Sequence, residues 1–270
     1  SPKSTSSTDT TTSSTETTTT STSSTSSTTS TTTNVVKELS KTYAEVDSDY
    51  AFYYSYEEKF NVAQLGDAKL YKVYDLIAVD EEGNYVLDEE GNKIVVNNEV
   101  EEEDITGLVD FGDATPANTF NVENTTFRYD VPLSYFGDAL FDQDGNAITA
   151  EAYIGKRGDV TLDNIITVSD ATYMLTAYTK INAVTGAVDA NTVLFTRDVM
   201  TKDPASVLDQ FAAFLGDVDC NITDNFKATK DQRAIIATDA TYILSASVKL
   251  NSNYTGTEKA LWEEILGKTL

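Results

Sequence analysis

Apolar and polar positions alternate through the first half of the chain beyond residue 33, and this pattern predicts β-strands. A period of two is typical of strands that bury one face. Gly-Asn pairs and two prolines separate the alternating segments and indicate turns between them. The alternating segments are 51–56, 70–77 and 127–131. We therefore expect an Ig-like β-sandwich over residues 34–152.

Two adjacent eight-residue units, 80–87 and 88–95, both begin Asp-Glu-Glu-Gly-Asn and continue with a short strand-like run. The Gly-Asn pair in each unit is a turn signal, so the units predict a protruding β-hairpin. A related motif between Asp142 and Asn146 imitates the start of a calcium-binding loop. The twelfth position of that loop would be Tyr153, which carries no carboxylate, so we expect a hairpin turn there.

Beyond residue 153 the spacing of apolar positions becomes helical, and residues 153–270 are expected to form a small all-α domain. A helix is predicted to open at Asp203-Pro204, because Asp is a good cap and Pro is favoured at the first helical position. The apolar residues on its buried side are Val207, Leu208, Phe211, Phe214 and Leu215. A last helix is expected from about Thr257 to Leu266, ending at Gly267.

This second half contains an internal repeat with an irregular register. Gly158-Asp159-Val160 recurs 58 residues later, whereas 166–178 recurs 69 residues later with seven of thirteen positions identical. The difference indicates an eleven-residue insertion in the second copy, at about 222–233. Each copy leads into a helix that begins Asp-Ala-Thr-Tyr. The expected inward stripes are Ala171, Met174 and Tyr178 in the first helix, and Ala240 and Ile243 in the second.

Side-chain oxygens upstream of both helices follow the spacing of an EF-hand calcium loop. The first copy spans twelve residues, from Asp159 to Asp170, whereas the second begins at Asp217 and reaches Asp239 late. Helix capping alone accounts for Asp170 and Asp239, but it leaves the upstream carboxylates unexplained. The sequence therefore predicts two bound Ca²⁺ ions.

The expected ligands are mostly side-chain oxygens, which suit calcium. Those of the first ion are Asp159, Thr161, Asp163, the carbonyl of Ile165, and Asp170. Those of the second ion are Asp217, Asp219, Asn221, the carbonyl of Ala234, and Asp239.

Composition removes several other functions. Residues 1–33 are Ser or Thr at 29 positions, which predicts a solvated, disordered linker. The net charge of −25 argues against a nucleic-acid partner, and no apolar run is long enough for membrane insertion. The absence of histidine excludes Ser-His-Asp catalysis, and with Cys220 as the single cysteine it also excludes a tetrahedral zinc site. The chain is expected to be a monomer on its own.

The repeat resembles the dockerin, the duplicated calcium-loop-and-helix module of cellulosomes. The residues that carry this resemblance are Gly158-Asp-Val and Asp170-Ala-Thr-Tyr-Met-Leu, with their second copies. The β region resembles the X module that precedes cell-anchoring dockerins in ruminococcal cellulosomes, through 111–120, 153–159 and 206–215. The resemblance implies the C-terminus of a scaffoldin or cellulose-adhesion protein, which binds a cohesin on a cell-wall-attached protein. An extracellular location at the bacterial cell surface follows from that setting.

The chain also departs from the family pattern. Thr161 stands where Asn or Asp is usual, and Ile236 offers no side-chain oxygen at the ninth position. Enzyme-borne dockerins commonly carry Lys-Arg where this chain has Leu175-Thr176 and Leu244-Ser245, which implies a more apolar specificity. The residues expected to contact the cohesin are Val168, Ser169, Thr172, Leu175, Thr176, Ala237, Thr238, Thr241, Leu244 and Ser245.

Two functions of other classes remain open from the sequence. A calcium-stiffened adhesion module would bind polysaccharide through exposed aromatics, for which Tyr50, Tyr53, Tyr54 and Tyr56 are the candidates. A carbohydrate-active enzyme would need paired carboxylates. The candidates Glu81, Glu82, Glu89 and Glu90 all lie in turn sequences, where acids are usually solvated.

Overall fold

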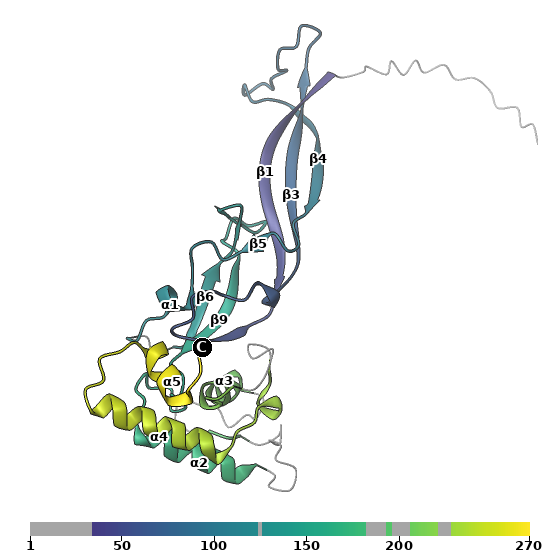
Figure 1. Ribbon diagram of the computed structural model, residues 1–270. Helices are drawn as coiled ribbons and strands as arrows, with labels where there is room; N and C mark the ends of the chain where they lie inside the picture. The colour runs from purple at the N-terminus through teal and green to yellow at the C-terminus, as the bar shows by residue number, and fades with distance from the viewer. Residues whose placement is uncertain (1–33, 124–125, 182–192, 196–205, 221–227) are drawn as a thin grey trace, which may run out of the picture.

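The structure is a computed structural model that describes residues 34–123, 126–181, 193–195, 206–220 and 228–270. An elongated β region leads into a helical base, and the C-terminus lies where the two meet (Figure 1). Within the described residues, the strands form three sheets of three strands each. The β-rich character of the first half is therefore confirmed. The arrangement differs from the two stacked sheets of the expected sandwich.

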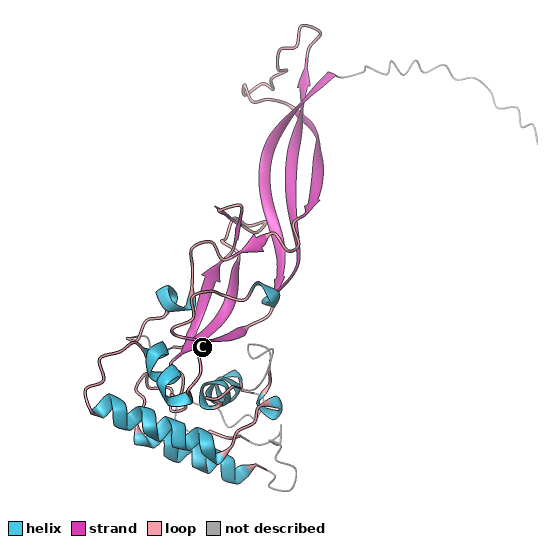
Figure 2. Ribbon diagram, viewed as in Figure 1, coloured by secondary structure: helices cyan, strands magenta, loops and turns pink. Residues whose placement is uncertain are grey.

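The first sheet forms a stalk that points away from the helices (Figure 2). It consists of β1 (Asn34–Ser48), β3 (Leu65–Val79) and β4 (Val95–Asp104), antiparallel in the order β1-β3-β4. Most of its side chains are exposed or half-buried. Its lower end joins a core cluster through Ala44, Ala68 and Leu70, and Ile77 and Ala78 are buried near its tip. The backbone ladder therefore holds most of the stalk. Exposed cross-strand ion pairs contribute little to its stability.

The tip of the stalk is built from the two repeated turn units. Asp80 accepts hydrogen bonds from the backbone N–H groups of Glu82 and Asn84, at 3.0 and 2.8 Å, and Asp88 repeats this arrangement in the next unit. Asp142 makes the same turn, with N–H donors from Asp144 and Asn146. The expected turns are confirmed, because an Asx side chain satisfies its own local backbone.

Two smaller sheets connect the stalk to the base. One pairs β2 (Ala51–Tyr54) in parallel and β6 (Arg128–Pro132) antiparallel with the central β9 (Thr149–Gly155). The other joins β5 (Val109–Asp110), β7 (Ser134–Tyr135) and β8 (Asp138–Ala139), while η1 (Val62–Gln64) and the short α1 (Pro116–Thr119) lie in the connections. The expected domain limit at 152/153 falls inside β9.

The helical base contains α2 (Val168–Lys180), α3 (Val207–Gly216), α4 (Ala237–Asn251) and α5 (Glu258–Leu266), with η2 (Lys230–Gln232) before α4. α2 and α4 lie side by side (Figure 1). The last helix ends as expected, since Gly267 takes the left-handed conformation at φ 66°. The expected start of α3 at Asp203-Pro204 lies outside the described residues.

Burial agrees with most of the predicted stripes. Ala171, Met174, Ala240 and Ile243 are buried. Tyr178 was expected to face inward, but it is 44% exposed, so that assignment is wrong. The stripe continues through Ala177 instead, three residues after Met174, because a small side chain fits the close contact between the two helices.

One core joins the sheet to the helices. Phe52, Phe127 and Tyr153 from the β region lie in the same buried cluster as Phe211 and Phe214 of α3. The ring centroid of Phe211 is 5.3 Å from that of Phe52 and 5.8 Å from that of Tyr153. Gly155 allows this approach, because a Cβ there would lie 2.9 Å from Phe211 Cζ. The β region and the helical base are thus packed as one unit.

Candidate metal centres and docking face

The first loop, residues 159–170, begins at a glycine with a geometric role. Gly158 has φ 88°, in the left-handed region, and a Cβ there would lie 2.8 Å from Trp262 Cζ2. Its N–H donates to the carbonyl of Leu215 at 2.7 Å. The glycine that opens the repeat is therefore required by the backbone turn and by the packing of α5.

Asp159 and Asp170 are buried at the centre of the first loop. Asp159 accepts the N–H groups of Asp163 and Asn164, at 3.1 and 2.7 Å. Asp170 accepts those of Thr161 and Thr167, at 2.9 and 2.7 Å. The backbone of the loop is thus folded around two carboxylates.

The two carboxylates disfavour each other's charge. Burial, with the nearby charge of Asp170, raises the pKa of Asp159 to about 7, and burial also raises the pKa of Asp170. Ionising both carboxylates therefore costs free energy, and a divalent cation bound between them would offset that cost. Thr161 is buried beside them, with its hydroxyl 3.3 Å from Asp159 Oδ1.

Two of the expected ligands of the first loop face outward. Asp163 is exposed, and its carboxylate accepts the N–H of Ile165 at 3.0 Å. The side chain of Ile165 is also exposed, in keeping with its expected use of the carbonyl alone. The structure therefore brings Asp159, Thr161 and Asp170 together and leaves Asp163 at the rim.

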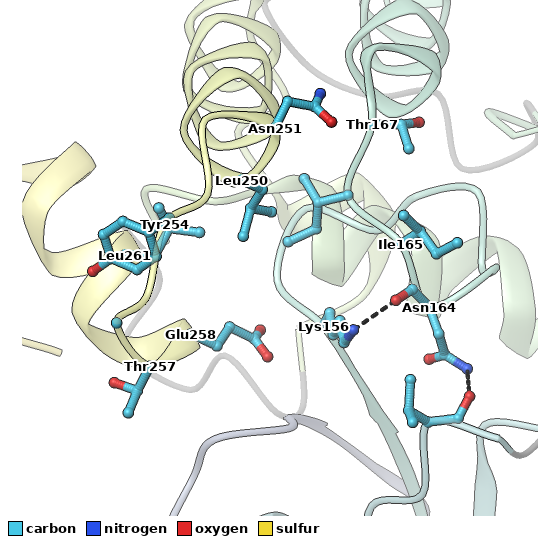
Figure 3. Close-up of a pocket in the computed structure, with 13 residues that line it drawn as sticks. Lys156, Asn164, Ile165, Thr167, Leu250, Asn251, Tyr254, Thr257, Glu258 and Leu261 are labelled. Carbon is cyan, nitrogen blue, oxygen red and sulfur yellow. Dashed lines mark hydrogen bonds between the residues drawn. The ribbon is translucent and has the colours of Figure 1, made fainter.

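A cleft of about 440 Å³ lies beside the first loop, lined in part by Leu250, Tyr254 and Leu261 (Figure 3). Lys156 stands at its floor and donates to the carbonyl of Asn164 at 2.7 Å. The side-chain amide of Asn164 donates to the carbonyl of Val122 at 2.9 Å. The Asn164–Val122 contact ties the loop to the β region.

The second loop runs from Asp217 to Asp239. Carboxylate oxygens of Asp217, Asp219 and Asp239 lie within 4.8 Å of one another, and Asp217 and Asp239 are fully buried. Asp239 accepts the N–H groups of Val218 and Ile236, at 3.2 and 2.9 Å, as Asp170 does in the first loop. The third expected ligand, Asn221, lies outside the described residues, and the side chain of Ala234 is exposed.

Asp217 is the least satisfied of these acids. Both of its carboxylate oxygens are buried without a hydrogen-bond partner among the residues that the structure describes. Burial raises its pKa to about 6, although Arg233 opposes that shift, and burial raises the pKa of Asp239 to about 7. A buried carboxylate without a donor is costly unless another group neutralises it.

These residues fit a hard divalent cation. Calcium takes six to eight oxygen ligands from carboxylates, carbonyls and water, and the second loop offers three converging carboxylates, one of which lacks donors. In the first loop Asp159 and Asp170 would hold the ion together with Thr161. A bound cation would supply the positive charge that both loops need for their acids to stay ionised.

Basic side chains around the second loop were not anticipated from the sequence. Arg233 Nη1 is 4.0 Å from Asp217 Oδ2, with both side chains buried. Arg157 donates to the carbonyl of Val218 at 3.2 Å and lies over the ring of Tyr54, while Lys268 donates to the carbonyl of Asp219. The spacing of the repeat gives neither arginine a place beside the acids, so only long-range packing reveals their role.

The described part of the insertion packs closely against α3. Residues 222–227 lie outside the described residues, but Lys230 forms a buried ion pair with Asp209 at 3.1 Å. Asp209 also accepts the N–H groups of Leu194 and Phe195. The inserted segment is therefore part of the core at its C-terminal end.

The docking face consists of the ten residues that the resemblance implies on α2 and α4. Leu175 is 47% exposed and Leu244 is 42% exposed, in equivalent positions of the two helices. Of the other eight, Ser245 is half-buried and seven are exposed: Val168, Ser169, Thr172, Thr176, Ala237, Thr238 and Thr241. Both repeats therefore present one exposed leucine among small side chains, most of them Thr or Ser, with Val168 and Ala237 as the apolar exceptions.

The aromatic platform of the adhesion alternative is not accessible. Tyr53 and Tyr54 are buried, Tyr56 is half-buried, and only Tyr50 is exposed. Tyr54 stacks on Phe214 with ring centroids 4.4 Å apart. That alternation of aromatics serves the core, so Tyr53 and Tyr54 are not accessible for the sugar contact of this alternative. The four glutamates of the enzyme alternative all lie exposed in the tip.

Comparison with known proteins adds one family. Residues 49–137 match the model of the cellulose-binding protein CttA N-terminal domain. That is a cellulose-binding family rather than a catalytic one, in keeping with the expectation that the chain is not an enzyme. The match covers about a third of the chain and ends before both loops. A search of curated proteins gave no match.

None of the described helices has the length and apolar character needed to cross a membrane.

Proposed function

We propose that the chain is a calcium-dependent docking module that binds a cohesin domain. In this role it attaches a scaffoldin or cellulose-binding protein to the extracellular surface of a bacterium. The observation that carries the proposal is Asp217, a buried carboxylate without hydrogen-bond donors beside Asp219 and Asp239. The matching arrangement around Asp159 and Asp170 supports the same role for the first loop.

Calcium links the loops to the docking face. Each loop ends at the carboxylate that caps the following helix, Asp170 on α2 and Asp239 on α4. A cation that keeps these acids ionised stabilises the helix starts, because the same oxygens accept the N–H groups of the residues before the helix and an ionised carboxylate is the stronger acceptor. Loss of calcium therefore loosens the helices that present Leu175 and Leu244.

The surface chemistry of the docking face supports a protein partner. An exposed leucine surrounded by Thr, Ser and Ala is a compact apolar anchor with hydrogen-bonding groups at its rim. Protein interfaces commonly take most of their energy from a few such anchors.

The decisive experiment is a cohesin-binding assay with and without chelator, combined with calcium calorimetry. We expect the wild-type chain to bind two calcium ions and to lose its cohesin in EDTA. Asp217→Asn removes one calcium event, and Asp231→Asn, which changes an exposed acid of the inserted segment, serves as the control. If Asp217→Asn still bound two calcium ions with the affinities of the wild type, the assignment of the second loop would be contradicted.

A second candidate function is direct cellulose binding by the β region, which the family match at residues 49–137 supports. Retention of the chain on cellulose in the presence of EDTA favours this function. Retention by a cohesin that is abolished by EDTA favours docking.

A further inference from the structure

The two loops of this protein balance their charge in different ways. In the second loop the guanidinium of Arg233 lies 4.0 Å from Asp217, and both side chains are fully buried. Among the residues described, Asp159 and Asp170 of the first loop have no basic side chain within ion-pair distance. The residue equivalent to Arg233 in the first repeat is Asn164, which is neutral and reaches to the carbonyl of Val122.

Arg233 is held in place by contacts on its other sides. It donates to the carbonyl of Ala228 at 2.8 Å, and its guanidinium carbon lies 5.0 Å from the centre of the Phe214 ring. Ala228 belongs to the inserted segment and Phe214 to α3. The charge is therefore positioned by α3 and by the inserted segment. Of these two, only the inserted segment has no counterpart at the first loop, because Leu215 of α3 accepts the N–H of Gly158.

A fixed guanidinium at this position has two opposite effects. It stabilises ionised Asp217 when no metal is bound, and it repels a divalent cation that approaches the same carboxylates. An arginine cannot relieve that repulsion by losing its proton, because guanidinium stays charged in proteins.

We propose that Arg233 is a built-in counter-ion of the second loop, which keeps that loop formed without metal and makes it the weaker of the two calcium sites. This inference rests on the proposed function, since it concerns the same two loops. It predicts that the first loop takes up calcium at lower concentrations than the second.

Backbone contacts to the two loops are of the same kind. Arg157 donates to the carbonyl of Val218 and Lys268 to that of Asp219. In the first loop Lys156 likewise donates to the carbonyl of Asn164, while the peptide N–H groups of Thr161, Asp163 and Asn164 donate to the acids. The difference between the loops therefore lies at the carboxylates, where the described residues place a guanidinium beside Asp217 but no cation beside Asp159 or Asp170.

The test compares wild type, Arg233→Gln and Lys249→Gln by calcium calorimetry and by melting in EDTA. Lys249→Gln removes the same unit of charge at a partly exposed pair with Glu264, near the end of α4 opposite to Asp239. The event that Asp217→Asn abolishes is assigned to the second loop. We expect Arg233→Gln to tighten that event at least about tenfold, because a unit charge at this distance in a buried site is poorly screened.

The remaining readouts separate this role from simple packing. Arg233→Gln should lower the melting temperature of the metal-free chain more than that of the calcium-loaded chain, while Lys249→Gln changes neither event by more than about twofold. An unchanged or weaker second event in Arg233→Gln overturns the inference. A wild-type chain that binds fewer than two calcium ions overturns the proposed function itself.

A second pair of variants keeps the test decisive if Arg233→Gln does not fold. Arg233→Lys retains the charge and Arg233→Met retains most of the apolar stem. A tighter second calcium event in the methionine variant than in the lysine variant supports the counter-ion. Equal affinities in the two variants contradict it.

Discussion

Asp159 and Asp163 are two residues of one loop with the same side chain and different surroundings. Asp159 is buried and accepts two backbone N–H groups, whereas Asp163 is exposed and accepts the N–H of Ile165. A carboxylate at the rim of the loop can hydrogen-bond to water. Its ionised form therefore loses less stabilisation than a buried carboxylate when calcium leaves. The two acids should therefore contribute differently to the calcium affinity of the loop.

We predict that Asp159→Asn abolishes the calcium event of the first loop. Asp163→Asn should weaken the same event on the order of tenfold, because ligand charge tunes affinity but an exposed ligand is replaced by water. Calorimetry of both variants at one ionic strength measures the difference. Equal losses in the two variants would show that Asp163 turns inward when calcium binds.

Glu57 gives a prediction about pH at a residue outside both loops. Burial raises its pKa from the ordinary 4.5 to about 7, although it accepts the N–H of Tyr54 at 2.9 Å. The folded chain thus holds this proton more tightly than the unfolded chain. Wild-type stability should fall as the pH rises from about 4.5 to about 7 through this group.

We therefore predict that Glu57→Gln stabilises the fold above pH 7, by on the order of 2 kcal/mol at pH 8, and has almost no effect near pH 4.5. Glutamine keeps an oxygen for the Tyr54 N–H without the buried charge. Urea unfolding of both chains across this pH range, with calcium present, measures the difference. A constant difference at every pH would contradict the assigned cause.

At the scale of elements, α2 and α4 each divide into one buried and one exposed face. Met174 and Ile243 are fully buried on the inner faces, and Leu175 and Leu244, one residue further along, are exposed. The starts of the helices differ. Thr167 caps α2 with its hydroxyl, whereas Ile236 before α4 relies on Asp239 alone.

We predict that Leu175→Ala and Leu244→Ala each weaken cohesin binding by about 2 kcal/mol, the loss typical of a central apolar anchor. Neither change should affect the melting temperature or the calcium content, since both side chains face solvent. The matched controls Met174→Ala and Ile243→Ala should lower stability by about 2–5 kcal/mol. If cohesin binding fell only in proportion to the folded fraction in all four variants, the docking face would not lie on these helices.

At the scale of the whole molecule, the β region and the helical base share one core centred on α3. Phe211 contacts the rings of Phe52, Phe127 and Tyr153, all from the β region. Arg157 lies two residues after β9 and donates to the second loop, so the sheet also supports a candidate metal centre. Stability of the loops should therefore depend on the sheet.

We predict that Phe211→Ala lowers the free energy of unfolding by about 3–5 kcal/mol and leaves a single cooperative transition. The fluorescence of buried Trp262 and the hydrogen exchange of the β9 amides should report the same midpoint. Phe136→Ala is the control, since that side chain is 79% exposed and should change stability by less than about 0.5 kcal/mol. Separate midpoints for Trp262 and β9 would show two independent units.

Much of the fold was encoded locally and was predictable. The Asp-Glu-Glu-Gly-Asn turns, the cap at Gly267 and the buried faces of α2 and α4 depend on residues within a few positions of each other. The repeated spacing from Asp159 to Asp170 likewise identified acids that the structure buries together. Tyr178 was misjudged, because periodicity alone does not reveal which neighbour covers a face.

The sequence by itself determined the two repeats and the acids that cap their helices, and it predicted the ligands of both candidate metal centres, because these depend on short-range spacing. Only the tertiary structure decided that β2 pairs in parallel with β9, and that Arg157 and Arg233 reach the second loop. It also decided which acids turn inward, Asp159 and Asp217, and which remains at the rim, Asp163. Such contacts join residues far apart in the chain, and their energies depend on burial that no local pattern records.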